Sequence, residues 1–170
     1  MIEHVKTLET HHAMRITPRS IWKNPIHFIA FGFGSGAMPF APGTFGTLVA
    51  IPLFLMIQPL SLFHYLLVLF ACFVVGCFIC DIAEKASGVR DHSGIVFDEI
   101  VGYFATMIAA PKGWIWLLIG FVLFRIFDIW KPQPIRWVNQ QVHGGFGIML
   151  DDILAAILAW LIIQGLAHLV

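Results

Sequence analysis

The uncharged stretch at 60–80 limits what this chain can fold into more than any other feature of the sequence. Its 21 residues are mostly Leu, Phe, Val and Cys, and no Asp, Glu, Lys or Arg interrupts them. A helix of about 20 apolar residues is long enough to cross the hydrocarbon core of a membrane. The rest of the chain agrees, because 59% of its residues are hydrophobic and only 12% are charged, against about 25% charged residues in soluble domains. This composition is typical of a membrane protein.

Other apolar segments alternate with short polar breaks and predict further helices. They cover 48–57, 95–110, 114–130, 135–141 and 148–170, while "GFGSGAMPFAPGTFGT" at 32–47 and "HGGFG" at 143–147 read as loops. A helix of fifteen residues is only about 22 Å long, less than the roughly 30 Å of the hydrocarbon core. We therefore expect an all-α fold, a compact bundle of membrane-embedded and interfacial helices. Residues 1–23 would form an N-terminal cytoplasmic tail and 24–170 a single domain.

The distribution of basic residues predicts how this bundle is oriented. If 48–57 pairs with 60–80 and 100–110 with 114–127, the N-terminal segment, 81–99 and 125–152 share one face. Nine of the ten Lys and Arg residues lie in those segments, and only Lys112 lies opposite. The positive-inside rule then makes the shared face cytoplasmic and the protein multi-pass. The net charge is zero and no polybasic tail is present, so the sequence does not indicate a nucleic-acid partner.

Five carboxylates are expected on that same face. They are Asp98 and Glu99 before one apolar helix, Asp128 at the end of the next, and Asp151 and Asp152 at the start of the last. Either adjacent pair could simply occupy a first helical turn, where the helix dipole favours negative charge. Asp128 does not fit that explanation, because a carboxylate is disfavoured near a helix C-terminus; pairing with Arg125 or Lys131 is the alternative there.

Five like charges gathered in a partly desolvated site would repel one another strongly. A hard divalent cation removes this conflict, and Mg²⁺ prefers carboxylate oxygens to the nitrogen and sulfur ligands typical of Zn²⁺ sites. We therefore expect Mg²⁺ as cofactor, held by carboxylates from this set.

Basic and glycine-rich elements beside the acids predict a phosphate site. Arg125, Lys131 and Arg136 flank Asp128, and a phosphate ester held by a metal and cations would fit there. Arg136 could instead anchor the chain to anionic lipid headgroups. In "APGTFGT" at 41–47, Gly43 and the N-cap candidates Thr44 and Thr47 precede an apolar helix whose free N–H groups could receive a phosphate, although a structural turn is the simpler reading.

Two histidines on the same face, His92 and His143, could act as a general acid or base near neutral pH. A loop histidine that caps a helix end is the more common outcome.

Four blocks of sequence together resemble the bacterial phosphatidylglycerophosphatase A family. They are "NPIHFIAFGFGSGAMPFAPGTFGT" at 24–47, "DHSGIVFDEIVG" at 91–102, "FRIFDIWKPQPIRW" at 124–137 and "VHGGFGIMLDDILA" at 142–155. The resemblance implies a Mg²⁺-dependent lipid phosphatase of the bacterial inner membrane that converts phosphatidylglycerophosphate to phosphatidylglycerol and inorganic phosphate. The implied partners are this phospholipid substrate and membrane lipids. The family's motifs fall on the five carboxylates, on Lys131 and on Thr44.

Within that resemblance, we assign catalysis to Asp98, Glu99, Asp128, Lys131 and Asp152. The expected mechanism is attack by a metal-activated water, with Lys131 stabilising the developing charge. A covalent aspartyl intermediate on Asp98 or Asp128 is the alternative. Two rival functions are a CDP-alcohol phosphatidyltransferase, whose long acidic signature is absent here, and a small ion transporter, which would carry its carboxylates in the middle of helices.

Overall fold

The computed structural model describes residues 18–169, and these residues form helices and loops without a strand. Their helices are α2 (Pro18–Lys23), α3 (Pro25–Ala30), the 3₁₀ helix η1 (Gly32–Ala37), α4 (Pro42–Ile57), α5 (Leu62–Ser87), α6 (Phe97–Thr106), α7 (Trp114–Trp130), α8 (Ile135–Gln141) and α9 (Gly144–Ala167). The all-α class predicted from the sequence is confirmed.

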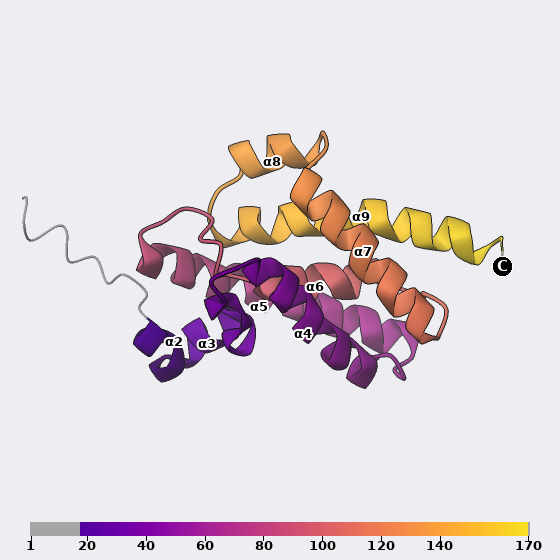
Figure 1. Cartoon of the computed structure of the whole chain (residues 1–170), viewed down its shortest axis with the longest axis horizontal. Helices are drawn as coiled ribbons and strands as arrows, with labels where there is room; N and C mark the ends of the chain where they lie inside the picture. Colours follow the sequence, from indigo (N-terminus) through magenta and orange to yellow (C-terminus); the bar gives the residue numbers. More distant parts are fainter. Residues whose placement is uncertain (1–17, 170) are drawn as a thin grey trace, which may run out of the picture.

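The short helix α6 is the centre of the bundle (Figure 1). It packs against α4, α5, α7 and α9, and every one of its residues except Glu99 is buried. Tyr103 and Phe104 extend its apolar surface into the core. At ten residues, α6 is shorter than the helix expected over 95–110, because the chain leaves helical geometry at Met107 and turns toward Pro111.

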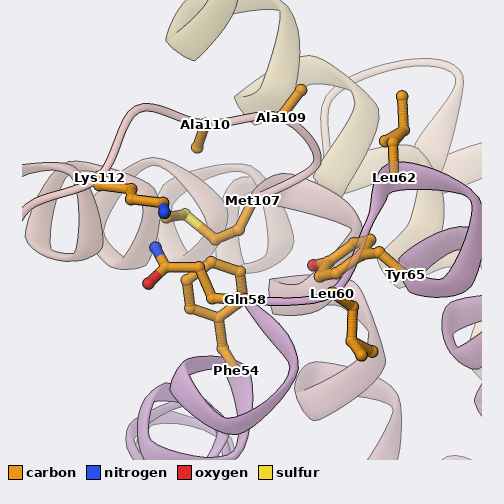
Figure 2. A pocket seen from close by; sticks show the side chains of 9 residues that line it. All are labelled: Phe54, Gln58, Leu60, Leu62, Tyr65, Met107, Ala109, Ala110 and Lys112. Atoms are coloured by element: carbon orange, nitrogen blue, oxygen red, sulfur yellow. The ribbon is translucent and has the colours of Figure 1, made fainter.

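The turns between α4 and α5 and between α6 and α7 lie side by side at one end of the bundle. A pocket there is lined by residues of both turns, including Gln58, Leu60 and Lys112, as Figure 2 shows. The Tyr65 hydroxyl donates a hydrogen bond of 2.6 Å to the Phe104 carbonyl and ties the two hairpins together. The start of α6, helix α8 and the start of α9 lie at the other end (Figure 1). The hairpin arrangement expected from the sequence is therefore present.

Two helices, α5 and α9, are long and apolar enough to cross a membrane. At 26 residues α5 is about 39 Å long, and most of its apolar stretch is exposed on the outside of the bundle. Its exposed side chains include Phe63, Phe70 and Phe78, and large apolar patches of this kind are rare on surfaces that face water. Half of the apolar stretch of α9 is buried against α5, α6 and α7. Two helices of this kind, one of them with an exposed apolar surface, indicate a membrane protein.

Two helices begin earlier than the sequence pattern predicted. Helix α4 starts at Pro42, because proline is suited to the first position of a helix; part of the stretch read as a loop is therefore helical. Helix α9 starts at Gly144, so the expected "HGGFG" loop is its first turn. Glycine is needed there, since a Cβ on Gly145 would collide with the Cys77 carbonyl oxygen of α5.

The expected N-terminal tail divides into two parts. Residues 1–17 lie outside the described part of the chain. Residues 18–23 form α2, which packs against α3 and η1 and buries Ile21 in the core. The last residues assigned to the tail therefore belong to the folded domain.

Candidate active site

Three carboxylates meet where α6 and α9 cross. One oxygen each from Asp98, Glu99 and Asp152 lies within 4.8 Å of the others. Asp98 Oδ1, Glu99 Oε2 and Asp152 Oδ2 are buried and have no hydrogen-bond partner among the described residues. Buried acceptors are rarely left in this state, because an unsatisfied polar group away from water costs about 1–3 kcal/mol. Three neighbouring carboxylates, each with an unpartnered buried oxygen, form a donor set suited to a hard cation.

Small residues allow the elements around this triplet to approach closely. A Cβ on Gly102 of α6 would lie 3.3 Å from the Asp152 Cβ and would collide with the Phe124 ring of α7. Asp152 itself is in the third turn of α9, eight residues after Gly144, and only 3% exposed. The explanation of Asp151 and Asp152 as first-turn acids is therefore wrong, whereas Asp98 and Glu99 do lie in the first turn of α6.

The fourth carboxylate, Asp128, is held by an arginine at the end of α7. Arg125 donates a hydrogen bond from its guanidinium to Asp128 Oδ2, three residues along the same helix. The same guanidinium nitrogen lies 3.8 Å from Glu99 Oε1. Asp128 is buried and lies close to Asp152. Arg125 thus connects Asp128 to the edge of the triplet.

The fifth carboxylate, Asp151, is paired with Lys131. The Lys131 ammonium donates a hydrogen bond to Asp151 Oδ2, and Asn139 Nδ2 donates to the same oxygen at 2.8 Å. Lys131 ends α7 in a left-handed conformation with φ of 43°, which turns the chain and places its side chain against α9. The structure therefore divides the five acids into two that are hydrogen-bonded to cations and three that are not, of which only Glu99 has a more distant ion pair among the described residues, with Arg125.

Burial and mutual proximity raise the pKa of two members of the triplet. Desolvation raises the pKa of Asp98 well above its ordinary value, and the neighbouring Glu99 adds to the shift. Desolvation and then Asp152 do the same to Glu99. Without a cation, these groups would therefore hold protons in a pH range where exposed carboxylates are ionised. For Lys131, burial alone would lower the pKa, but Asp151, Asp152 and Asp128 outweigh burial and raise it, so the ammonium stays charged.

The glycine-rich start of α4 reaches this cluster. A Cβ on Gly43 would overlap Glu99 Oε1 and would lie 3.0 Å from both terminal nitrogens of Arg125. The N-cap expectation is wrong at both threonines. Ala41 is the N-cap, the Thr44 N–H donates to the Ala41 carbonyl, and the buried Thr47 hydroxyl donates to the Gly43 carbonyl at 2.9 Å. Gly43 is thus brought to the site, while the backbone N–H of Thr44 is already used.

The family model of phosphatidylglycerophosphatase A matches residues 28–167. The chain belongs to this family. Membership makes it a phosphatase. The matched range contains the triplet, the Arg125–Asp128 and Lys131–Asp151 ion pairs, and the start of α4.

Two members of the phosphatidylglycerophosphatase A family are similar to this chain over most of its length. The protein of that name from Escherichia coli strain K12 is 45% identical over 146 residues, 85% of each chain. The one from Haemophilus influenzae is also 45% identical, over 85% of this chain and 90% of its own. A protein from Bacteroides thetaiotaomicron, provisionally named a phosphatidylinositol-3-phosphatase, is 40% identical over 79% of this chain and 89% of its own. No solved structure matches the chain.

Among the described residues, three further candidates from the sequence are not bonded to the triplet. Arg136 is exposed on α8. His143 precedes α9, about 12 Å along the helix axis from Asp151, with Nδ1 placed 2.8 Å from the Gln141 carbonyl oxygen. His92 Nδ1 accepts a hydrogen bond from the Gly94 N–H. Within residues 18–169, no hydrogen bond joins either histidine to one of the five carboxylates.

Two polar residues near the site were missed by the sequence reasoning. Asn139 of α8 bridges Asp151 and Asp91, at 2.8 Å and 3.3 Å, and its carbonyl accepts from Arg90. Asp81 of α5 accepts a hydrogen bond from the Gly145 N–H at 3.4 Å and thus caps the start of α9. Asp81 is the first charged residue after the apolar run at 60–80, and Asn139 lies in the short amphipathic segment 135–141. Neither pattern indicates a role at the site.

Proposed function

We propose that this protein hydrolyses the terminal phosphomonoester of phosphatidylglycerophosphate, yielding phosphatidylglycerol and inorganic phosphate. We further propose that the reaction requires Mg²⁺ and takes place at the cytoplasmic face of the bacterial inner membrane, in a multi-pass chain. The observation that carries the proposal is the triplet of buried carboxylate oxygens without partners. It lies beside two partly buried cations, Arg125 and Lys131, in a chain that belongs to a lipid phosphatase family.

The triplet fits Mg²⁺ by donor type and by its lack of other partners. Asp98, Glu99 and Asp152 supply only oxygen atoms, within 4.8 Å of one another. A bound Mg²⁺ would polarise the phosphoryl group and lower the pKa of a water molecule. Asp128 and Asp151 are already bonded to Arg125 and Lys131, so they would lie beside the metal without binding it directly.

The residues around the triplet can each take part in phosphate hydrolysis. Water attacks phosphorus, the bond to the glycerol oxygen breaks, and the products are an alcohol and inorganic phosphate. Arg125 and Lys131 have donors beyond those bonded to Asp128 and Asp151, and these would bind the phosphoryl oxygens as charge develops. Asp128, beside the triplet but outside it, would accept the proton of the attacking water, and this proton would then pass to the leaving glycerol oxygen. Gly43 packs directly against Glu99 and Arg125, where there is no room for a side chain.

A covalent aspartyl intermediate remains the alternative chemistry, with Asp128 as its nucleophile. Asp98 suits this role less, because Asp98 is a member of the carboxylate triplet to which we assign the metal. The stereochemistry at a chiral, isotopically labelled phosphoryl group separates the two, since direct attack by water inverts the configuration at phosphorus and two successive displacements through Asp128 retain it.

The two rival functions fit the structure less well. The transporter reading needs carboxylates along a path through the bundle, whereas the five acids lie in one group formed by the start of α6, the end of α7 and the third turn of α9. The transferase reading has no support from the family match.

Phosphate release from defined lipids in detergent micelles tests the proposed reaction. We expect the wild type to release phosphate from phosphatidylglycerophosphate in the presence of Mg²⁺ and Asp128→Asn to lose at least a hundredfold in kcat. No release by well-folded wild type on any lipid phosphate would contradict the proposal. The name of the Bacteroides relative makes phosphatidylinositol 3-phosphate the second substrate to assay.

Cysteine labelling tests the proposed orientation. Lys112 lies in the turn between α6 and α7, whereas Gln141 ends α8 at the other end of the bundle. In a variant whose three native cysteines are replaced by alanine, a membrane-impermeant thiol reagent should label Lys112→Cys in intact spheroplasts. It should label Gln141→Cys only after permeabilisation, and the reverse pattern would overturn the orientation.

A further inference from the structure

A shallow groove runs along the outer face of α7 and ends at α8. It is lined by apolar side chains of α7 between Phe121 and Trp130, together with Arg125 and Arg136. Ile126 and Trp130 are 48% and 67% exposed. A groove with apolar walls and two guanidinium groups suits an amphipathic anion better than it suits water or a purely apolar chain.

Arg125 belongs both to this groove and to the acid cluster. Its guanidinium bonds Asp128 and approaches Glu99, and its buried Nε has no partner among the described residues. An anion that enters along the groove would therefore meet Arg125 first and would reach the carboxylate triplet directly behind it.

Arg136 is the second cation of the groove and is placed further from the acids. It lies on α8, two residues after the Pro134 that precedes this helix, and is exposed. Within residues 18–169, no ion pair joins it to a carboxylate. The charge of Arg136 is therefore available to a ligand in the groove, while Arg125 lies at the reactive site.

We propose that this groove binds the lipid part of the substrate, with Arg136 paired to the phosphodiester next to the diacylglycerol while Arg125 faces the phosphomonoester. The inference rests on the proposed function. Phosphatidylglycerophosphate carries two phosphates separated by a glycerol unit, and two separated arginines match two separated anions. Arg136 is thus a specificity-determining residue: it favours lipids that have a phosphodiester between their acyl chains and the phosphate to be removed.

Phosphatidic acid is the matched test substrate, because it has the acyl chains and a phosphomonoester but no phosphodiester. In neutral detergent micelles, we expect Arg136→Gln to raise KM for phosphatidylglycerophosphate at least tenfold, since hydrogen bonds between charged groups are among the strong ones. The kcat should change less than threefold. The same substitution should affect kcat/KM for phosphatidic acid much less, so the preference of the wild type for the diester lipid should decrease. Lys112→Gln, at the opposite end of the bundle, serves as the control and should behave as wild type.

The outcomes separate this inference from the function on which it rests. If the wild type does not hydrolyse phosphatidylglycerophosphate, the proposed function fails. If the wild type is active but Arg136→Gln loses equally on both lipids, the assignment of Arg136 to the phosphodiester is overturned. A loss that is equal for both lipids and appears only in vesicles rich in anionic lipid would identify Arg136 as a membrane anchor instead.

A groove-filling variant tests the apolar part independently. Ile126→Trp should lower kcat/KM for both lipids at least fivefold and have less effect on water-soluble glycerol 3-phosphate, which lacks acyl chains. Ile115→Trp is the matched control, because Ile115 lies at the other end of α7 with a similar exposed fraction of 51%. Equal effects of the two substitutions on the lipids would contradict a binding role for the groove.

Discussion

The Lys131 ammonium donates a hydrogen bond to Asp151 Oδ2, joining the end of α7 to the third turn of α9. Asp151 is only 3% exposed, so its charge depends on this partner and on Asn139. The pair positions α9, and with it the adjacent Asp152, against α6. Stability and activity should therefore respond differently when the pair is removed one residue at a time.

Lys131→Met should destabilise the fold by about 3–5 kcal/mol, because it leaves a buried carboxylate without its cation, and should reduce kcat at least a hundredfold. Adding Asp151→Asn removes the uncompensated charge, so the double variant should regain most of the melting temperature but not the activity. Thermal unfolding in micelles and phosphate release measure the two effects. Recovery of activity together with stability would show that Lys131 has only a structural role.

Gly43→Ala should lower kcat/KM by ten- to a hundredfold with little change in melting temperature. The added methyl group would collide with Glu99 Oε1 and crowd Arg125, and small displacements of catalytic groups are costly in rate. Gly165→Ala on α9 is the control, since a Cβ there meets nothing within 4 Å, and alanine is the better helix former. Equal activity of the two variants would exclude Gly43 from the site.

Stability without Mg²⁺ should fall as the pH rises above the ordinary carboxyl range. The pKa of Asp98 and of Glu99 is raised in the folded chain, so over this range the folded state binds more protons than the unfolded state. The stabilising contribution is complete at low pH and is lost as the pH passes through the raised values. Mg²⁺ replaces those protons, so it should raise the melting temperature more at pH 8 than at pH 6. A Mg²⁺ effect that is the same at both pH values would argue against binding at these carboxylates.

The helix limits of α7 and α8 could be predicted from the sequence, because Gly113, Lys131 and the following prolines interrupt apolar patterns there. The starts of α4 and α9 could not. Glycines resemble loop residues in a sequence, but at Gly43 and Gly145 they permit close contact with Glu99 and with the Cys77 carbonyl.

The order of the hairpins predicted that the five acids would gather at one end. It did not predict which of them would be bonded to Arg125 or Lys131. Arg125 and Lys131 were both possible partners for Asp128, and only the packing of α7 against α9 assigns Lys131 to Asp151. Asn139 was missed for the same reason, because it contacts Asp151 and Asp91 only after α8 folds back over α9.

The Mg²⁺ dependence of phosphate release tests the central claim most directly. Wild type and Asp152→Asn would be stripped of metal with EDTA in micelles and titrated with Mg²⁺ on phosphatidylglycerophosphate. We predict no turnover by the wild type before Mg²⁺ is added, saturable recovery as it is added, and a midpoint for Asp152→Asn at least tenfold higher in Mg²⁺ concentration. Undiminished turnover by the stripped wild type, or identical midpoints for the two proteins, would contradict a metal site formed by Asp98, Glu99 and Asp152.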